Sequence, residues 1–386
     1  MFEKVIHAFD FTAPGLRDHP FQQQLRSLPT PYALSHALSS DAAWRTFTAD
    51  LEARLRTALA QDPPISAYNR RYLEDYLRRF DYFMGSYRQL LGAAVSSLDK
   101  PWEETTLVDY GGGCGLLSYL VRLSGVGRVV YNDLYEVSVH DVGVLGRLMD
   151  LEPHLRISGG IDAVLACLSL DDHAVPLWLS YDVMEHIYDP WDWFRQLRDQ
   201  PGPFQVWALS HANEANPVRA RGLRRLHHRA EHVGFPAEAG WKADDLARPF
   251  IEVRREWIAE HAPELSPQEH NWMATHSRGL YGKGLFEAVD RYRRHGSWDH
   301  PLPGATNTCD PRSGNWTEHL IDMDAFCDYL EELGYRTDLK AVRYSYSGSG
   351  PKDNLKKALN RMMARFPRWA RHLAPAYLLS ARFPRH

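Results

Sequence analysis

The sequence predicts an α/β protein built on a doubly wound, mostly parallel sheet. A short apolar run at residues 107–108 ends at Asp109, and a glycine-rich turn and a helix-period apolar run follow it. A second apolar run at residues 129–132 ends at Asp133. Strand-like and helix-like segments then alternate as far as residue 210, which is typical of parallel strands joined by crossover helices.

Seven segments are predicted to be strands, because each is a short apolar run bounded by turn-forming or charged residues. They lie at residues 106–109, 129–133, 155–160, 175–182, 204–209, 337–345 and 375–382. Helix-period patterns fall between the strands, and Gly334 supplies a stop signal after one of them. These helices are expected at residues 116–123, 138–149, 163–168 and 324–333.

The first strand leads into a turn in which Gly111, Gly113 and Gly115 occupy every second position after Asp109. Glycine is needed where φ is positive or where a ligand must approach the backbone closely. The helix that follows presents its open N-terminal amides to such a ligand. The spacing differs from the Gly-x-Gly-x-x-Gly of dinucleotide-binding proteins, because Leu116 stands where the third glycine would be.

This Asp-x-Gly-x-Gly-x-Gly run resembles the first motif of class I S-adenosylmethionine-dependent methyltransferases, and all four of its fixed positions are matched. The resemblance implies a Rossmann-like core, S-adenosylmethionine as cofactor and S-adenosylhomocysteine as product. It places Asp109, Gly111, Gly113 and Gly115 at the cofactor. Asp133, eighteen residues after Gly115, stands where an acid usually holds the ribose hydroxyls.

Asp162 follows the third predicted strand, where the family usually places a contact to the adenine ring. Its carboxylate could accept a hydrogen bond from the adenine amino group. It could equally cap the short helix expected at residues 163–168, because Asp is a preferred N-cap residue. Both alternatives remain open at this point.

A second stretch, from Asp182 to Pro190, follows the fourth predicted strand. It resembles the acid-x-x-Glu-His-x-x-Asp-Pro run of many small-molecule methyltransferases. This resemblance implies that Asp182 is a cofactor-binding residue. The fifth strand leads directly to His211. His186 and His211 are the candidate general bases, because imidazole titrates near neutral pH. For His186 the alternative is that the ring only braces its loop.

The rest of the chain is predicted to surround this core. Residues 1–40 are expected to be a loose arm, followed by helical stretches at 41–59 and 68–95. The Tyr-rich face of the second stretch either covers the cofactor pocket or packs in the core. A polar loop at 307–319 is expected over a site, and a basic amphipathic helix at 354–366. The expected domains are an arm and helical lid (1–100), the cofactor-binding core (101–211), a helical insertion that caps the acceptor (212–316) and the completion of the sheet (317–386).

The insertion contains a short basic stretch between Arg219 and Arg229, which could contact an anionic substrate or form a solvated helix face. Its helices are expected at residues 245–260 and 284–294. Cys309, Asp310 and His319 lack the close spacing of metal ligands, so no metal is expected. In the family that the motifs resemble, the last strand inserts antiparallel.

The bulk composition excludes several classes. The 386 residues have a net charge of −4, which disfavours nucleic-acid binding by overall charge but not by a local basic patch. Four cysteines without paired spacing, and no secretory signal, predict a reduced cytoplasmic protein. No apolar run approaches membrane-spanning length.

The expected activity is methyl transfer from S-adenosylmethionine to an O or N acceptor on a small molecule, sugar or natural product. One alternative is a S-adenosylmethionine-binding scaffold or regulatory subunit without catalysis. A NAD-dependent oxidoreductase is disfavoured by Leu116. A homodimer remains an open alternative.

Overall fold

The structure is a computed structural model that describes residues 34–169, 175, 177–235, 248–304, 306–346, 348 and 350–384. Most of the expected N-terminal arm and the start of the helix expected at residue 245 lie outside the described residues.

A seven-stranded sheet has the strand order β3-β2-β1-β4-β5-β7-β6. Its strands are β1 (Thr106–Tyr110), β2 (Arg128–Asp133), β3 (Leu155–Ser158), β4 (Leu177–Tyr181), β5 (Phe204–Ser210), β6 (Arg336–Val342) and β7 (Ala376–Phe383). β1 pairs in parallel with β2 and β4, and β2 pairs in parallel with β3. β7 pairs antiparallel with β6, so the sheet is mixed. All seven predicted strands and the antiparallel last strand are confirmed.

The chain divides into two compact units, which are described separately. Among the described residues, the first unit runs as far as Leu179 and includes Gln200–Gln205. The second unit comprises Ser180–Asp199 and the chain from Val206 onward.

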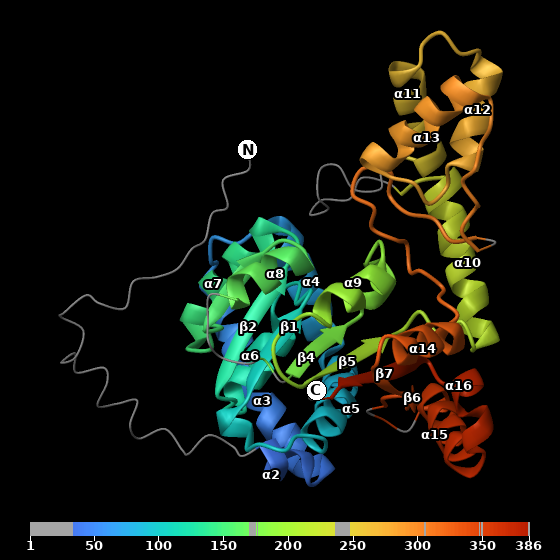
Figure 1. Cartoon of the computed structure of the whole chain (residues 1–386). Coiled ribbons are helices and arrows are strands. Elements are labelled where there is room, and N and C mark those ends of the chain that lie inside the picture. The colour runs from blue at the N-terminus through green and yellow to red at the C-terminus, as the bar shows by residue number, and fades with distance from the viewer. Residues whose placement is uncertain are drawn as a thin grey trace. The chain divides into compact units, whose positions relative to one another are not determined.

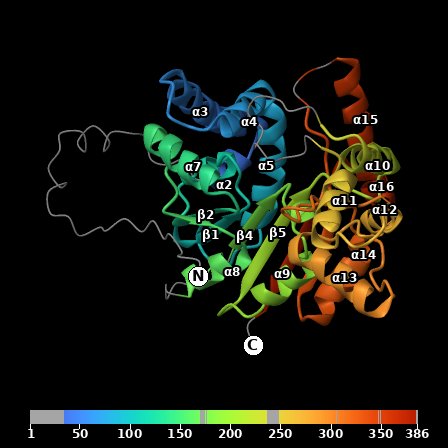
Figure 2. The ribbon, with the colours of Figure 1, turned by 90° about the horizontal axis from the view of Figure 1, so that it is seen from above.

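In the first unit, helices cover both faces of β1–β3. Figure 2 shows α2, α3 and α7 on one face and α8 on the other. The helices are α2 (Leu34–Leu38), α3 (Asp41–Ala60), α4 (Ala67–Arg78), α5 (Phe80–Val95), η1 (Trp102–Glu104), α6 (Leu116–Leu123), α7 (Glu136–Met149) and α8 (Ile161–Leu168). The stretch 68–95, expected as one helix, is broken at Arg79, whose φ of −119° and ψ of 29° are not helical.

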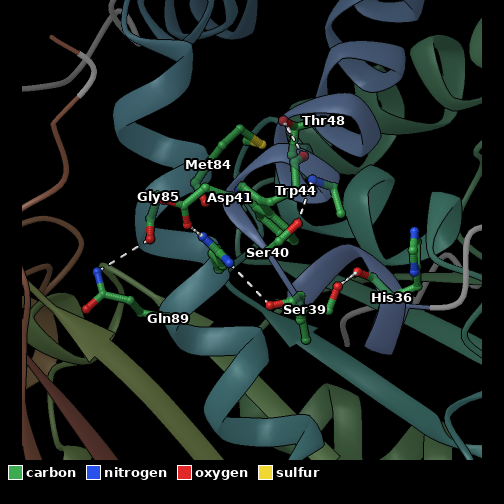
Figure 3. Close-up of polar contacts among 12 residues, drawn as sticks. His36, Ser39, Ser40, Asp41, Trp44, Thr48, Met84, Gly85 and Gln89 are labelled. Atoms are coloured by element: carbon green, nitrogen blue, oxygen red, sulfur yellow. Dashed lines mark hydrogen bonds and ion pairs between the residues drawn. The ribbon is translucent and has the colours of Figure 1, made fainter.

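The N-terminal helices α2, α3 and α5 are tied together by side chains that bond to the neighbouring helix (Figure 3). The Trp44 indole N–H donates to the carbonyl of Met84 at 3.1 Å. Arg88 forms an ion pair with Asp41 and donates to the carbonyl of Leu38 at 3.2 Å. α3 in turn packs against α6 and α7, so this region is part of the core of the first unit.

α4 is anchored to α7 by a single buried carboxylate, that of Asp141. Its Oδ2 accepts from the Ser66 backbone N–H at 3.0 Å, the Ser66 hydroxyl at 2.5 Å and the Asn69 amide at 2.8 Å. Asp141 lies only eight residues after Asp133. Half-buried Tyr68 and Tyr72, whose rings meet edge to face at 5.1 Å, therefore belong to a helix held near the end of β2.

In the second unit, α10 leads from the region after β5 to a group formed by α11, α12 and α13 (Figure 1). The helices are η2 (Met184–His186), α9 (Pro190–Leu197), α10 (Pro217–His232), α11 (Phe250–His261), α12 (Pro267–His276), α13 (Gly282–His295), α14 (Met323–Glu332), α15 (Pro351–Arg365), η3 (Pro367–Trp369) and α16 (Ala370–Leu373). α12 was not predicted, although Ser266 and Glu269 form a capping box at its start.

The α11–α13 group has its own apolar core, formed by side chains that are almost fully buried. Its members are Ile258, Ala262, Met273, Ala274, Leu285 and Val289. Next to this core lies a buried ion pair between Arg254 of α11 and Glu231 of α10. Thr308 donates to the second oxygen of Glu231 at 2.7 Å, and Arg254 Nε donates to the carbonyl of Ala274 at 3.1 Å. One ionic cluster therefore joins α10, α11, α12 and the loop that follows α13.

The ion pair predicts a specific pattern of stability. Arg254→Met should lower the free energy of unfolding by roughly 3–5 kcal/mol, because it leaves the Glu231 carboxylate buried without its cation. The double variant Glu231→Gln/Arg254→Met should recover most of this loss, since it removes both charges and keeps an acceptor for Thr308. Urea unfolding measures both. Equal losses in the single and double variants would show that packing, and not the unpaired charge, is the cause.

Candidate active site

The glycine turn of the first unit adopts the conformation that its sequence predicts. Gly111, Gly113 and Gly115 have φ of 69°, 55° and 83°, in the left-handed region that favours glycine. A Cβ at Gly115 would come within 2.7 Å of Val142, so this glycine allows α6 to pack against α7. A Cβ at Gly113 would meet nothing within 4 Å, so the backbone of Gly113 faces open space.

Asp133 stands beside that open turn. Its Oδ2 accepts from the Gly113 backbone N–H at 2.9 Å, and its Oδ1 accepts from the Tyr135 backbone N–H at 2.9 Å. Only 7% of the residue is exposed. The two amides fix the plane of the carboxylate at the end of β2, and a carboxylate can accept about four hydrogen bonds. Such a group can orient two vicinal hydroxyls.

Asp109 lies beneath the turn, where it is 1% exposed. Its Oδ2 accepts from the Ser118 hydroxyl at 2.6 Å, which ties the end of β1 to α6. A Cβ at Gly112 would approach the same oxygen to 2.8 Å. Burial raises the pKa of Asp109 to about 7, while the Ser118 hydrogen bond opposes the shift. These contacts give Asp109 the position of a residue that supports the turn from below.

The end of β3 meets the end of β2 through one backbone hydrogen bond and one from the Asn132 side chain. Gly159 N–H donates to the Asp133 carbonyl at 3.0 Å, and the Asn132 amide donates to the Gly159 carbonyl at 2.9 Å. α8 begins at Ile161, and its N-cap is Gly160. Capping by Asp162 is therefore wrong: the residue lies exposed in the first turn of α8, two residues inside the position that capping requires.

In the second unit, Asp182 and His211 form a hydrogen-bonded pair. Asp182 directly follows β4 and has a φ of +53°, which is uncommon for a residue with a side chain. Its Oδ1 accepts from the His211 backbone N–H at 2.9 Å. His211 Nδ1 lies 2.8 Å from Oδ1 and 3.0 Å from Oδ2 of the same carboxylate. A predicted cofactor residue and a predicted general base are thus directly bonded.

The pairing determines which nitrogen of His211 is basic. Although burial raises the pKa of Asp182, the His211 ring and the hydrogen bonds of His211 lower it below its usual value overall. An ionised carboxylate accepts only, so Nδ1 carries the hydrogen and Nε2 is the basic nitrogen of the neutral ring. The Tyr181 ring meets the imidazole edge to face at 5.9 Å. Arg219, from the basic stretch, donates to the His211 carbonyl at 2.9 Å.

His186 braces a loop, as the alternative interpretation expected. Its Nδ1 lies 2.7 Å from the carbonyl of Trp316, and the Trp316 backbone N–H donates to the His186 carbonyl at 3.3 Å. The Trp316 indole N–H donates to the Tyr188 carbonyl at 2.8 Å, and its ring stacks on that of His319 at 4.3 Å. The polar loop at 307–319 is therefore ordered against η2 and the residues that follow it.

Glu185, between Asp182 and His186, belongs to the second motif, but the sequence predicts no role for it. It is fully buried. Burial, reinforced by the negative charges of Asp182 and Glu318, raises its pKa well above the usual value. Burial therefore favours the protonated, neutral form of Glu185. No pattern in the sequence distinguishes it from an exposed glutamate, because its burial arises from distant segments of the chain.

Comparisons with known proteins identify only remote similarity. No protein-family model and no curated protein matches the chain. Among solved structures, a chain of the complex of the Haloferax volcanii Trm112 methyltransferase activator with a methyltransferase is 13% identical, with a TM-score of 0.38, over 81% of this chain and 96% of that one. The plantazolicin methyltransferase BpumL, solved with SAH, is 11% identical, with a TM-score of 0.32, over 94% and 99%. The CurJ carbon methyltransferase is 8% identical, with a TM-score of 0.35, over 76% and 52%.

Two further observations apply to the described part of the chain. No group of three or more His, Cys, Asp or Glu residues there could hold a metal ion. None of the described helices is both long enough and apolar enough to cross a membrane.

The buried Asp109 predicts a pH-dependent stability. Its folded-state pKa lies above its ordinary value of 3.8, so between pH 3.8 and about 7 the folded state binds more protons than the unfolded state. The free energy of unfolding should fall as the pH rises through this window, by roughly 1.4 kcal/mol per unit of pKa shift. Asp109→Asn should flatten the profile, because an amide keeps an acceptor for Ser118 without titrating.

Denaturant unfolding of the ligand-free protein at a series of pH values tests this. The exposed acid Asp99 in the same unit gives the matched control, Asp99→Asn, which should leave the slope unchanged. An unchanged slope in Asp109→Asn would show that this carboxyl is not the group responsible.

Proposed function

We propose that the protein is a methyltransferase that binds S-adenosylmethionine and methylates an O or N acceptor on a small molecule, sugar or natural product. The observation that supports this most directly is the glycine turn, in which the Gly113 amide is bonded to Asp133 and the backbone faces open space. A carboxylate fixed at a strand end beside an open backbone suits a nucleoside whose ribose has two free hydroxyls.

The residues of the first unit carry chemical groups that could bind S-adenosylmethionine. Asp133 would accept from the ribose hydroxyls, and the exposed Asp162 would accept from the adenine amino group. The turn from Gly111 to Gly115 would lie against the methionine portion, with Asp109 supporting it. When bound, S-adenosylmethionine supplies a methyl group on a sulfonium, which leaves as a neutral thioether.

His211 is the general base of this proposal. An acceptor hydroxyl or ammonium must lose a proton as its oxygen or nitrogen is methylated, and Nε2 of His211 would receive that proton. The carboxylate of Asp182 then stabilises the imidazolium through Nδ1–H and holds the ring in one orientation. This pairing favours a catalyst over a cofactor-binding scaffold, because a scaffold has no need of an oriented base.

In this proposal, the remaining segments enclose the acceptor and the cofactor or complete the sheet. The insertion at 212–316, with its own core and with a loop braced by His186, would cap the acceptor and exclude water from it. The helical region within residues 1–100 would close the cofactor side through α4. The chain from 317 to 386 completes the sheet and takes no direct part in the reaction.

Cofactor binding tests the first part. Asp133→Ala should weaken binding of S-adenosylhomocysteine by roughly 1.5–3 kcal/mol, the range for hydrogen bonds to a charged group. Calorimetry on the purified protein measures it, with NAD as the competing ligand. Glu136→Ala, which removes an equal charge from the exposed start of α7, should bind normally. Binding of NAD without either methyl-donor ligand would contradict the proposal.

Turnover tests the second part. His211→Ala should lower turnover by roughly 10²–10⁴-fold, as expected for loss of a general base, and change cofactor affinity little. Asp182→Asn should also lower turnover, and the double variant should be no worse than His211→Ala, because the pair acts as one unit.

The assay is release of S-adenosylhomocysteine with a cell extract as acceptor source. A folded protein that binds cofactor but releases no product with any extract would support the scaffold alternative. Full turnover in His211→Ala would remove this histidine from the reaction. Weaker cofactor binding in Asp182→Asn would show that Asp182 also contacts the cofactor.

A further inference from the structure

The surface of α15 and η3 in the second unit exposes large apolar side chains that lie close together in sequence. Leu355 is 61% exposed, Met362 46%, Phe366 51% and Trp369 63%. Exposed apolar residues scattered singly are normal on a protein surface, whereas a group of four within fifteen positions indicates a binding surface.

Two of these side chains, Leu355 and Met362, lie seven positions apart in α15 and therefore share one face of the helix. Phe366 directly follows α15, with φ of −126° and ψ of 73°, and Trp369 lies in η3, so the apolar group continues past the end of the helix. These four residues are called the apolar stripe. Another side of the helix is anchored to the protein: Met363 is buried, and Asn360 exchanges two 2.9 Å hydrogen bonds with the backbone of Tyr344. The stripe therefore points outward from a helix that is already fixed.

Positive charge is concentrated in the same segment. Residues 351–373 contain seven Lys or Arg and one acid, a net charge of 7 − 1 = +6, whereas the whole chain carries −4, so the rest carries −4 − 6 = −10. The basic residues are Lys352, Lys356, Lys357, Arg361, Arg365, Arg368 and Arg371.

Most of these charges form no ion pair with an acid in the part of the chain that the structure describes. Lys356 pairs with Asp353, and Arg371 pairs with Asp324. The other five form no ion pair with another described residue. Arg361 and Arg365 each precede a member of the apolar stripe by one position, so they lie along its edge.

We propose that α15 and η3 bind the surface of an anionic lipid bilayer, with the helix axis parallel to the membrane plane. Leu355, Met362, Phe366 and Trp369 would enter the boundary between headgroups and acyl chains, and the flanking basic side chains would contact anionic headgroups. A helix with a basic face, low overall hydrophobicity and Trp, Phe and Leu on the other face is the kind that lies in this interface. The proposal does not depend on the methyltransferase activity.

Other occupants fit less well. A nucleic-acid backbone would use the basic residues but has no apolar surface to cover four apolar side chains. A second copy of this chain would bring the same +6 segment against itself, which like-charge repulsion opposes. An anionic bilayer satisfies both the apolar stripe and the unpaired charges.

Vesicle flotation of the full-length protein tests the proposal, in two lipid compositions: phosphatidylcholine alone and an equal mixture with phosphatidylglycerol. The protein should float with the mixed vesicles and bind neutral vesicles at least about tenfold more weakly, and high salt should release it. Phe366→Ser/Trp369→Ser and Arg361→Glu/Arg365→Glu should each reduce binding to mixed vesicles by about tenfold or more.

Matched controls come from α10, which also exposes apolar and basic residues. Val218→Ser/Val233→Ser and Arg221→Glu/Arg225→Glu should bind mixed vesicles like the wild type. Brominated phosphatidylglycerol should quench part of the tryptophan fluorescence of the wild type and less of it in Trp369→Phe. Because no S-adenosylmethionine is present, failure here is distinct from failure of the proposed activity.

Three results would overturn the proposal. One is absence of binding to mixed vesicles by a folded wild type. The second is binding that the α15 and η3 variants leave unchanged. The third is a dimer or a complex with duplex DNA that forms without lipid and is lost in those variants, which would assign the surface to another occupant.

Discussion

The hydrogen bond between the Gly113 amide and the Asp133 carboxylate is the contact on which the first unit's candidate site depends. It joins the turn after β1 to the end of β2, and the Asp133 carbonyl continues the connection to Gly159 before α8. A side chain at Gly113 would not clash with a neighbour, but its φ of +55° would be strained for most residues. The backbone conformation at position 113 therefore favours glycine, and the space in front of that backbone is open.

The acids near the strand ends illustrate how surroundings decide charge. Asp109 and Glu185 are buried, and burial raises the pKa of each. The Asp182 side chain is 34% exposed, and the His211 ring and its hydrogen bonds lower the pKa of this carboxyl below its usual value, although desolvation acts to raise it. Desolvation favours the neutral acid, whereas a hydrogen-bonded partner that can become cationic favours the carboxylate. Carboxyl groups near the strand ends thus differ: burial favours the neutral form of Asp109 and Glu185, whereas Asp182 is held as an anion bonded to the His211 ring.

The sequence predicted the features that depend on neighbours along the chain. The glycine turn and the strands β1 and β2 that flank it follow local rules, and the structure has all of them. Features that depend on distant contacts were not predictable. The Asp182–His211 bond spans 29 positions and the His186–Trp316 bond spans 130. Neither pairing leaves a periodic pattern, so the sequence alone could not distinguish the hydrogen-bond partners of the two candidate histidines.

The charged residues of the second unit show the same limit of prediction from sequence. The basic stretch on α10 appeared uniform in sequence, but its members have different surroundings: Arg219 donates to the His211 carbonyl, whereas Arg221 and Arg225 are exposed. Glu231, on the same helix, is buried by a partner on α11, so its charge stabilises the insertion and not a surface. On α15 the basic residues have few acidic partners, and four exposed apolar side chains accompany them. The role of a charged residue can thus be assigned only when its burial and its partners are known. The same type of side chain can bond to the end of a strand, join two helices or form a docking surface.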